Sequence, residues 1–299
     1  IHRNCASIIA WSMSNEPFFS DNRVMPQVRR FLKDLVAYSR ELDPTRPAAI
    51  GGCQRGEIDK LGDIAGYNGD GASLPEYQNP GVASVVSEYG STMADRPGKY
   101  EAGWGELPTA PGADKEVAGS WRMPWRSGEA IWCAFDHGSI AGRRFGGMGF
   151  VDYFRLPKRQ WYWYRNEYLK IAPPEWPKAG VAAGLKLTAD KTTLTAVDGT
   201  DDVQLIVTVV DKDGNALNNC PPVTLAIESG PGEFPTGPSI VFEANSDITI
   251  RDGQAAMAFR AYHAGKTLIR ATSPGLKDAT IEINSLGEPK FIAGVTPVV

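Results

Sequence analysis

Short, mostly apolar runs that stop at polar residues recur along the first half of the chain. Each run has the length of a β-strand, and each is followed at once by polar or charged residues. The runs are residues 6–11, 48–52, 62–68, 82–86 and 129–135. Apolar strands without a polar face are typical of parallel sheets that are covered on both sides, so this pattern predicts an α/β architecture.

Two longer segments have the spacing of helices. In residues 25–42, apolar side chains such as Val28 and Leu32 recur every three or four residues, and Pro44 stops the pattern because proline disfavours helix. Residues 159–169 predict a second helix that is rich in aromatic side chains. We assign these aromatic side chains to packing rather than to binding.

The period of the pattern changes to two after about residue 184. Apolar and outward-facing positions alternate in residues 203–210, and turn-forming segments such as 211–215 and 229–232 separate further short strands. The predicted strands include residues 185–188, 203–210, 223–227, 255–261, 267–271 and 279–283. About seven strands in roughly 100 residues predict an immunoglobulin-like β-sandwich.

A change in composition marks the boundary between these two parts. All eight tryptophans lie between Trp11 and Trp176, and none follows. The last of them, Trp176, is part of the proline-rich segment 172–177. Proline-rich segments are extended and poorly helical, so this one predicts a linker. We expect one domain over residues 1–178 and a β-sandwich with a short tail over residues 179–299.

Composition also narrows the classes of function. A formal net charge of −4 argues against a nucleic-acid surface, which needs clustered cations, and no apolar run is long enough to span a membrane. Four scattered cysteines predict buried free thiols, and three histidines leave little material for a metal site. We expect neither a metal nor a cofactor. The chain begins with Ile rather than Met, so we expect a piece of a longer or processed protein.

The candidate chemistry lies at the ends of the predicted parallel strands. Glu16 follows the first run and Glu88 follows the fourth. Paired carboxylates are what the cleavage of a glycosidic bond requires, one as acid and one as nucleophile or base. Trp132, within the fifth run and at the mouth of the predicted strand, is suited to stacking against the apolar face of a sugar ring.

Several of these segments resemble glycoside hydrolase family 2, which includes β-galactosidases, β-mannosidases and β-glucuronidases. Residues 7–16 (Ser-Ile-Ile-Ala-Trp-Ser-Met-Ser-Asn-Glu) resemble its fourth-strand signature, and residues 86–90 (Val-Ser-Glu-Tyr-Gly) resemble its nucleophile motif on strand seven. Residues 130–136 and 149–158 resemble the eighth strand and the segment after it. The resemblance implies strands four to eight of a (β/α)₈ TIM barrel. We therefore expect the piece alone to be inactive and poorly soluble without the missing N-terminal part of the same protein.

The resemblance also implies roles for individual residues. Glu16 corresponds to the general acid/base and Glu88 to the nucleophile of a retaining double displacement. We expect an ionised Glu88, whose charge raises the pKa of Glu16. Asn15 corresponds to a residue that binds the sugar 2-hydroxyl, and Trp132 to a wall of the subsite.

One position departs from the pattern of the family. Members often carry Asn-Tyr after strand six, with the tyrosine touching the nucleophile, whereas Asn68 is followed by Gly69 here. Tyr67 or Tyr89 could substitute for that tyrosine. His137 has two equally favoured interpretations: it contacts a sugar hydroxyl, or it is a polar loop residue without a role in binding.

The resemblance favours a β-galactoside as the carbohydrate substrate of an exo-acting enzyme. A β-glucuronide is less favoured because the Asn-x-Lys pattern expected for its carboxylate is missing, and a β-mannoside remains open. The second domain resembles bacterial Ig-like modules through residues 209–216 and 264–271, which implies a spacer in a periplasmic or extracellular bacterial protein. The other alternative is a non-catalytic carbohydrate- or surface-binding protein with a degenerate barrel.

Overall fold

The computed structural model describes residues 4–69, 77, 79–90, 92–103, 127–141, 144–243 and 248–296, without the side chains of residues 139–145. The chain forms two compact units. One comprises Ile1–Asp95 and Lys99–Phe150, and the other comprises Arg96–Gly98 and Val151–Val299.

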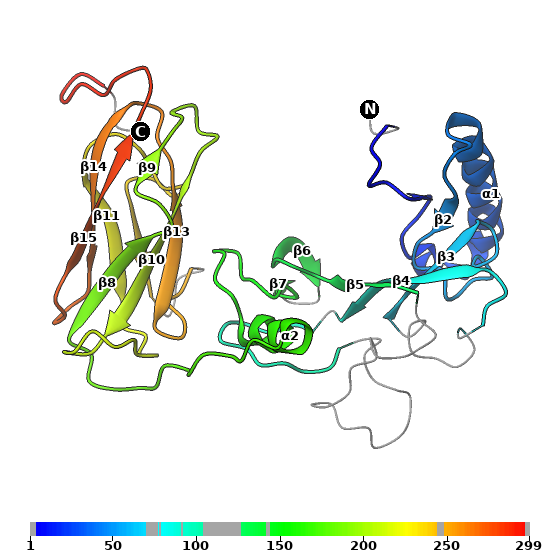
Figure 1. Ribbon diagram of the computed structural model, residues 1–299, viewed down its shortest axis with the longest axis horizontal. Coiled ribbons are helices and arrows are strands. Elements are labelled where there is room, and N and C mark those ends of the chain that lie inside the picture. Colours follow the sequence, from blue (N-terminus) through cyan, green and yellow to red (C-terminus); the bar gives the residue numbers. More distant parts are fainter. Residues whose placement is uncertain are drawn as a thin grey trace. The chain divides into compact units, whose positions relative to one another are not determined.

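The first unit is built on a parallel sheet of five strands (Figure 1). Its strands are β1 (Trp11–Ser12), β2 (Ala48–Ile50), β3 (Ile64–Asn68), β4 (Ala83–Gly90) and β5 (Glu129–Trp132). They lie side by side in the order of the sequence, and every neighbouring pair is parallel. The prediction of the later strands of a (β/α)₈ barrel is confirmed, because successive parallel strands in sequence order are how such a barrel is built.

Helix α1 (Met25–Leu42) covers part of this sheet, and its bounds are those predicted. Two short 3₁₀ helices, η1 (Pro17–Phe19) and η2 (Asn22–Val24), precede it. The apolar face of α1 packs on the strands in a cluster of buried side chains. This cluster comprises Met25, Leu32, Val36, Ala48, Ile50, Cys53, Ile58, Ala65 and Tyr67.

The first predicted strand is shorter than expected. The run 6–11 was expected to be a buried strand, but β1 contains only Trp11–Ser12, and the side chain of Ile9 is 80% exposed. Within the described residues, β1 pairs with β2 alone and forms one edge of the sheet. An edge strand lacks the second neighbour that would cover it, which is why the apolar run does not become a buried strand.

A short hairpin follows the sheet. Strands β6 (His137–Ala141) and β7 (Arg144–Gly146) form an antiparallel pair that the sequence analysis did not predict. The backbone N–H of Ala94 donates to the carbonyl of Gly147, so the segment after β4 is joined to the segment after this hairpin.

The second unit contains a β-sandwich (Figure 1). One sheet has the order β13-β10-β8 and the other β12-β11-β14-β15-β9. All neighbouring strands are antiparallel except β9 and β15, which are parallel. The strands are β8 (Gly184–Ala189), β9 (Thr193–Leu194), β10 (Val203–Val210), β11 (Val223–Ser229), β12 (Ser239–Phe242), β13 (Gln254–Phe259), β14 (Gly265–Thr272) and β15 (Ala279–Ser285).

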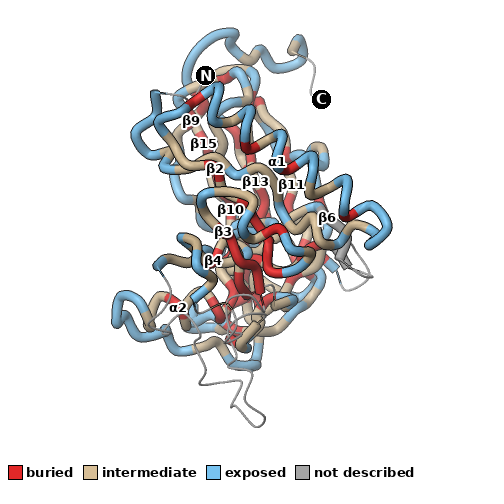
Figure 2. The backbone as a smooth tube through the Cα atoms, turned by 90° about the vertical axis from the view of Figure 1, so that its right-hand side faces the viewer, coloured by how far each residue is buried: buried red, intermediate tan, exposed pale blue. Residues whose placement is uncertain are grey.

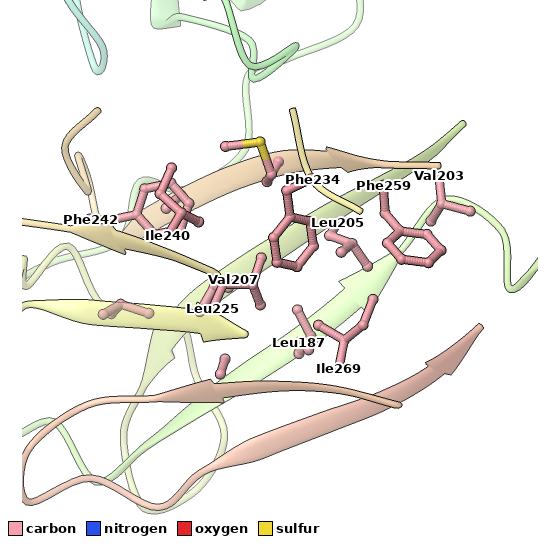
Figure 3. Close-up of a cluster of buried hydrophobic side chains, with 14 of the residues drawn as sticks. Leu187, Val203, Leu205, Val207, Leu225, Phe234, Ile240, Phe242, Phe259 and Ile269 are labelled. Carbon is pink, nitrogen blue, oxygen red and sulfur yellow. The ribbon is translucent and has the colours of Figure 1, made fainter. Parts of the chain in front are cut away.

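The core of the sandwich lies between the two sheets (Figure 3). Buried side chains from both sheets meet there, with Leu205 on β10 and Leu225 on β11 fully buried. Figure 2 shows many of the buried residues along the strands. The alternation of apolar residues predicted this sandwich, but it missed the short strands β9 and β12. Ile240 and Phe242 on β12 nevertheless contribute to the core.

Helix α2 (Arg159–Leu169), whose predicted bounds are correct, also belongs to the second unit. So does the short segment Arg96–Gly98, although it lies far from the rest of the unit in sequence. The side chain of Arg96 is buried, and it bonds Asp152 Oδ2 at 2.9 Å and the carbonyls of Arg251 and Gln254 at 2.6 and 2.7 Å. The compact units therefore divide the chain near residue 151, whereas the predicted domain boundary at 178 follows sequence composition.

All four cysteines are free, as predicted, but only Cys53 is buried. Cys133 is partly buried, and Cys5 and Cys220 are exposed, which corrects the expectation of buried thiols. Neither exposed cysteine lies within one of the strands, so no sheet covers it. Among the described helices, none is both long enough and apolar enough to cross a membrane.

Candidate active site

The carboxyl ends of the parallel strands bring polar side chains to one edge of the sheet. Asn15 and Glu16 follow β1, Asn68 is the last residue of β3, and Glu88 lies two residues before the end of β4. Asn68 and Glu88 are direct register partners, next to a bulge between Tyr67 and Asn68. Parallel strands end at the same side of a sheet, so residues far apart in sequence meet here.

The amide of Asn68 joins the segments that carry the two glutamates. Its Nδ2 donates to Asn15 Oδ1 at 3.0 Å and to Glu88 Oε2 at 3.2 Å. Asn15 is the residue immediately before Glu16. The structure therefore connects the two predicted catalytic segments through one buried side chain.

Glu16 sits in a tight backbone turn. Its φ and ψ are 51° and 43°, in the left-handed region, and its N–H donates to the carbonyl of Gly51 at 3.2 Å. Gly52 also has a positive φ, and a Cβ atom there would lie 2.5 Å from Glu16 Cγ and from the Glu16 nitrogen. Only glycine fits at position 52, so the Gly51-Gly52 pair after β2 sets where Glu16 lies.

The electrostatics of the site are dominated by burial. Partial burial raises the pKa of Glu88 to about 7, and the negative charge of Glu16 contributes in the same direction. Burial therefore favours the protonated form of Glu88 more than in a free carboxyl group, whereas the sequence pattern predicts an ionised Glu88. Glu16 Oε1 is buried and has no hydrogen-bond partner among the described residues.

Trp132 and His137 form the aromatic side of the site. Trp132 ends β5 and pairs in register with Gly90, two residues beyond Glu88. Its side chain is 41% exposed and lies edge-on to the ring of His137, with 5.4 Å between the ring centroids. Gly146 on β7 makes room for the imidazole, because a Cβ atom there would lie 2.1 Å from His137 Cε1. The peptide bond between Trp132 and Cys133 is cis.

Two family models match different parts of this chain. Residues 1–105 match the family model described as glycosyl hydrolases family 2, TIM barrel domain. Residues 185–282 match the model described as glycoside hydrolase family 2 C-terminal domain 5. The chain belongs to glycoside hydrolase family 2. None of the curated proteins matches it.

Solved structures of family 2 members share the fold. A β-glycosidase from Bacteroides vulgatus matches 94% of this chain and 51% of its own, with a TM-score of 0.68 and 17% identity. A family 2 member from Bacteroides cellulosilyticus DSM 14838 matches 94% of this chain and 49% of its own, with a TM-score of 0.64 and 16% identity. A family 2 β-glucuronidase matches 99% of this chain and 41% of its own, with a TM-score of 0.65 and 18% identity. The family 2 chain thus spans about half the length, or less, of these structures.

The two tyrosines proposed for the site lie in apolar clusters. Tyr67 is 2% exposed in the cluster beneath α1, and its ring lies 4.8 Å from that of Tyr77. Burial raises the pKa of the Tyr67 hydroxyl. Tyr89 is also 2% exposed and packs with Val86 and Ile131. In this family 2 chain, the structure gives neither tyrosine an exposed surface for a sugar.

The sequence analysis missed the residues that hold the site together. Asn68 was read only as the residue before an unexpected glycine, although a polar residue at the end of an apolar strand was a usable signal. Ser87 and Gln54 also bond to Asn68, and the sequence pattern gives neither of them a role of its own, although Ser87 directly precedes Glu88. Within the described part of the chain, no group of acidic, histidine and cysteine side chains is arranged to hold a metal ion.

Proposed function

We propose that this chain is the C-terminal part of the catalytic barrel, with its following β-sandwich, of a retaining exo-acting β-glycosidase. Its foremost substrates are terminal β-galactosides. The observation that carries this proposal is the placement of Glu16 after β1 and of Glu88 near the carboxyl end of β4 in one parallel sheet, linked through Asn15 and Asn68. A pair of carboxylates at such an edge suits glycoside hydrolysis by double displacement.

In the first step, Glu88 attacks the anomeric carbon of the terminal sugar. The bond to the leaving oxygen breaks while Glu16 gives its proton to that oxygen, so the sugar becomes esterified to Glu88. The productive state therefore has one proton on the pair, held by Glu16. The N–H that Asn68 donates to Glu88 favours this state, because a hydrogen bond to a carboxylate stabilises its ionised form.

In the second step, water replaces the leaving group. Glu16, now ionised, takes a proton from water as the oxygen attacks the anomeric carbon, and the ester bond to Glu88 breaks. Glu88 leaves as a carboxylate and Glu16 regains its proton. Two inversions at the same carbon retain the β configuration.

The remaining site residues would hold the sugar. The exposed ring of Trp132 offers an apolar wall, and His137 beside it offers a polar contact for a hydroxyl. Because Asn15 Oδ1 accepts from Asn68, its amide N–H groups would remain available to donate to the sugar 2-hydroxyl. Tyr67 and Tyr89 have no role in this proposal, because both are 2% exposed.

Two groups of alternatives compete with a β-galactosidase. One of the structures that share the fold is named a β-glucuronidase, so β-glucuronides, and with them β-mannosides, are the competing substrates. A non-catalytic binding protein has no need for both carboxylates, and the presence of Glu16 beside Glu88 counts against it. We also propose that the chain works with the N-terminal part that completes its barrel, in the periplasm or outside a bacterial cell.

The test uses the full-length enzyme and chromogenic β-galactoside, β-glucoside, β-mannoside and β-glucuronide substrates. We expect the highest kcat/KM for the galactoside, and Glu88→Gln should lower it by about 10³-fold or more. A 2-deoxy-2-fluoro galactoside should form a stable ester with Glu88, located by peptide mass spectrometry. Glu41→Gln, an exposed position on α1, is the matched control and should keep the wild-type rate.

Added azide separates the roles of the two glutamates. With Glu16→Ala, azide should replace water in the second step and give a β-glycosyl azide, whereas with Glu88→Ala it should attack directly and give the α product. The proposal fails if Glu88→Gln retains the wild-type rate or if the fluorosugar labels another residue.

A further inference from the structure

Both polar atoms of the Asn68 side chain have described hydrogen-bond partners. It is fully buried, and its two amide N–H groups are directed to Asn15 Oδ1 and Glu88 Oε2. Its Oδ1 accepts from the Ser87 hydroxyl at 2.6 Å. An ionised carboxylate can only accept, so the NH₂ group of Asn68 must face Glu88 and its oxygen must face Ser87.

The backbone at Asn68 is held independently of its side chain. Its N–H donates to Gln54 Oε1 at 3.1 Å, and Gln54 is itself 4% exposed. The Tyr77 hydroxyl donates in turn to the carbonyl of Gln54. The bulge in the pairing of β3 with β4 brings Asn68 into register with Glu88. A substitution at position 68 can therefore remove the amide while the backbone bond to Gln54 remains.

We propose that Asn68 is the positioning residue of this site, whose amide fixes Asn15 and Glu88 relative to one another and holds Glu88 ready to attack. The nucleophilic role of Glu88 in this inference rests on the proposed function, but the contacts of Asn68 do not depend on the substrate. Asn68 touches no reacting atom in this scheme, and it acts through Glu88 and Asn15.

The bond from Asn68 also bears on the charge of Glu88. Among the described residues, Glu16 after β1 is the charged group that acts on Glu88, and Asn68 on β3 is a neutral donor to it. Trp132 of β5 pairs in register with Gly90 and has the ring of His137 against it. Glu16 and burial already favour the protonated form of Glu88. Removing the Asn68 amide takes away a hydrogen bond that favours the ionised form, so the pKa of Glu88 should rise above 7.

The first experiment titrates Glu88 directly in the full-length protein labelled with ¹³C-glutamate, with the signal assigned through Glu88→Gln. Asn68→Ala should raise the pKa of Glu88 by about one unit, the expected size for a hydrogen bond to a charged group. Asn68→Asp should raise it further, because it replaces the donor with a carboxylate. This readout needs no substrate, so it succeeds or fails apart from the proposed function.

The second experiment follows kcat/KM on the aryl galactoside against pH. The limb on which activity falls with decreasing pH should move up by the same amount in Asn68→Ala, which alone lowers kcat/KM about fivefold at pH 7, and the lost positioning of Glu88 should lower it further. Ser87→Ala should move it less, and the double variant should equal Asn68→Ala alone, because Ser87 acts only through the Asn68 oxygen.

Asp63→Asn is the matched control, because Asp63 directly precedes β3 at its other end and bonds Arg40 and the N–H of Ala48. It perturbs the same strand and should leave both the titration and the pH limb at wild-type values. The inference is overturned if Asn68→Ala leaves the pKa of Glu88 within about 0.2 units of wild type, or if Asp63→Asn shifts it equally. If the titration shifts and the fluorosugar labels a different residue, the positioning of Glu88 stands and the proposed function falls.

Discussion

The parallel sheet and the β-sandwich bury different kinds of residue. At the carboxyl edge of the sheet, Gln54 and Asn68 are buried polar side chains, and the apolar cluster beside Glu88 contains only Val86 and Tyr89 with Ile131 against them. The sandwich instead has a continuous apolar core between its two sheets (Figure 3). The difference shows that the carboxyl edge of the sheet uses buried polar side chains to position the site, whereas the core of the sandwich holds a fold. Substitutions should therefore damage the two units in different ways.

The largest effect should come from emptying the sandwich core. Phe259 is fully buried, its ring packs edge-on to Phe234, and Gly232 leaves the space that the ring occupies. Phe259→Ala should lower the free energy of unfolding by about 3–5 kcal/mol, because the cavity cannot close around the lost ring. Calorimetry on the full-length protein measures this loss in the free energy of unfolding. Val241→Ala, at an exposed position on β12, should change it by less than about 0.5 kcal/mol.

The next effect concerns Arg96, a buried cation of the second unit that makes three described bonds. Arg96→Ala removes the buried cation that pairs with Asp152 and takes one donor from each of two backbone carbonyls, so we expect a loss of about 3 kcal/mol in the same calorimetric transition. Arg155→Ala is the control, because Arg155 and Asp202 form an exposed pair whose removal should cost less than about 1 kcal/mol. Equal losses for the two variants would show that burial of Arg96 adds nothing.

The sheet unit should respond in activity rather than in stability. Gly52→Ala places a methyl group against Glu16, and a displacement of the acid by about 1 Å should lower kcat/KM on the galactoside about 10²-fold. Gly81→Ala is matched to it, since Gly81 also has a positive φ but open space around its Cα. That variant carries the backbone strain without the clash and should keep kcat/KM within about twofold. The comparison between the units breaks down if both glycine variants lose activity alike.

The periodic parts of the chain could be predicted from sequence, and the contacts between them could not. The bounds of α1 and α2 follow from the spacing of apolar residues and from the residues that end each helix. Glu16 and Glu88 could be found because each stands at the end of an apolar run. The buried strand over residues 6–11 was wrong, since whether an apolar run is covered depends on neighbouring strands that its own pattern does not encode.

The bonds of the site depend on register, which no local pattern determines. Asn68 meets Glu88 because of a bulge in the pairing of β3 with β4, and a bulge leaves little trace in sequence. The glycines beside Glu16 could be noticed as a Gly-Gly pair, but their purpose appears only when the carbonyl of Gly51 is seen to accept the Glu16 N–H.

The second unit is discontinuous along the chain, and this limits how the protein can be dissected. Arg96–Gly98 belongs to it together with Val151–Val299, so no single peptide bond separates the two units. A protease cut in the proline-rich segment 172–177 would leave Arg96 and Asp152 on one fragment, with Arg96 bonded to the carbonyls of Arg251 and Gln254 on the other. A truncation that starts at residue 178 would produce a sandwich stripped of those bonds. An expression boundary for this half of the molecule is better sought before residue 151, with the Arg96 segment supplied as a separate piece.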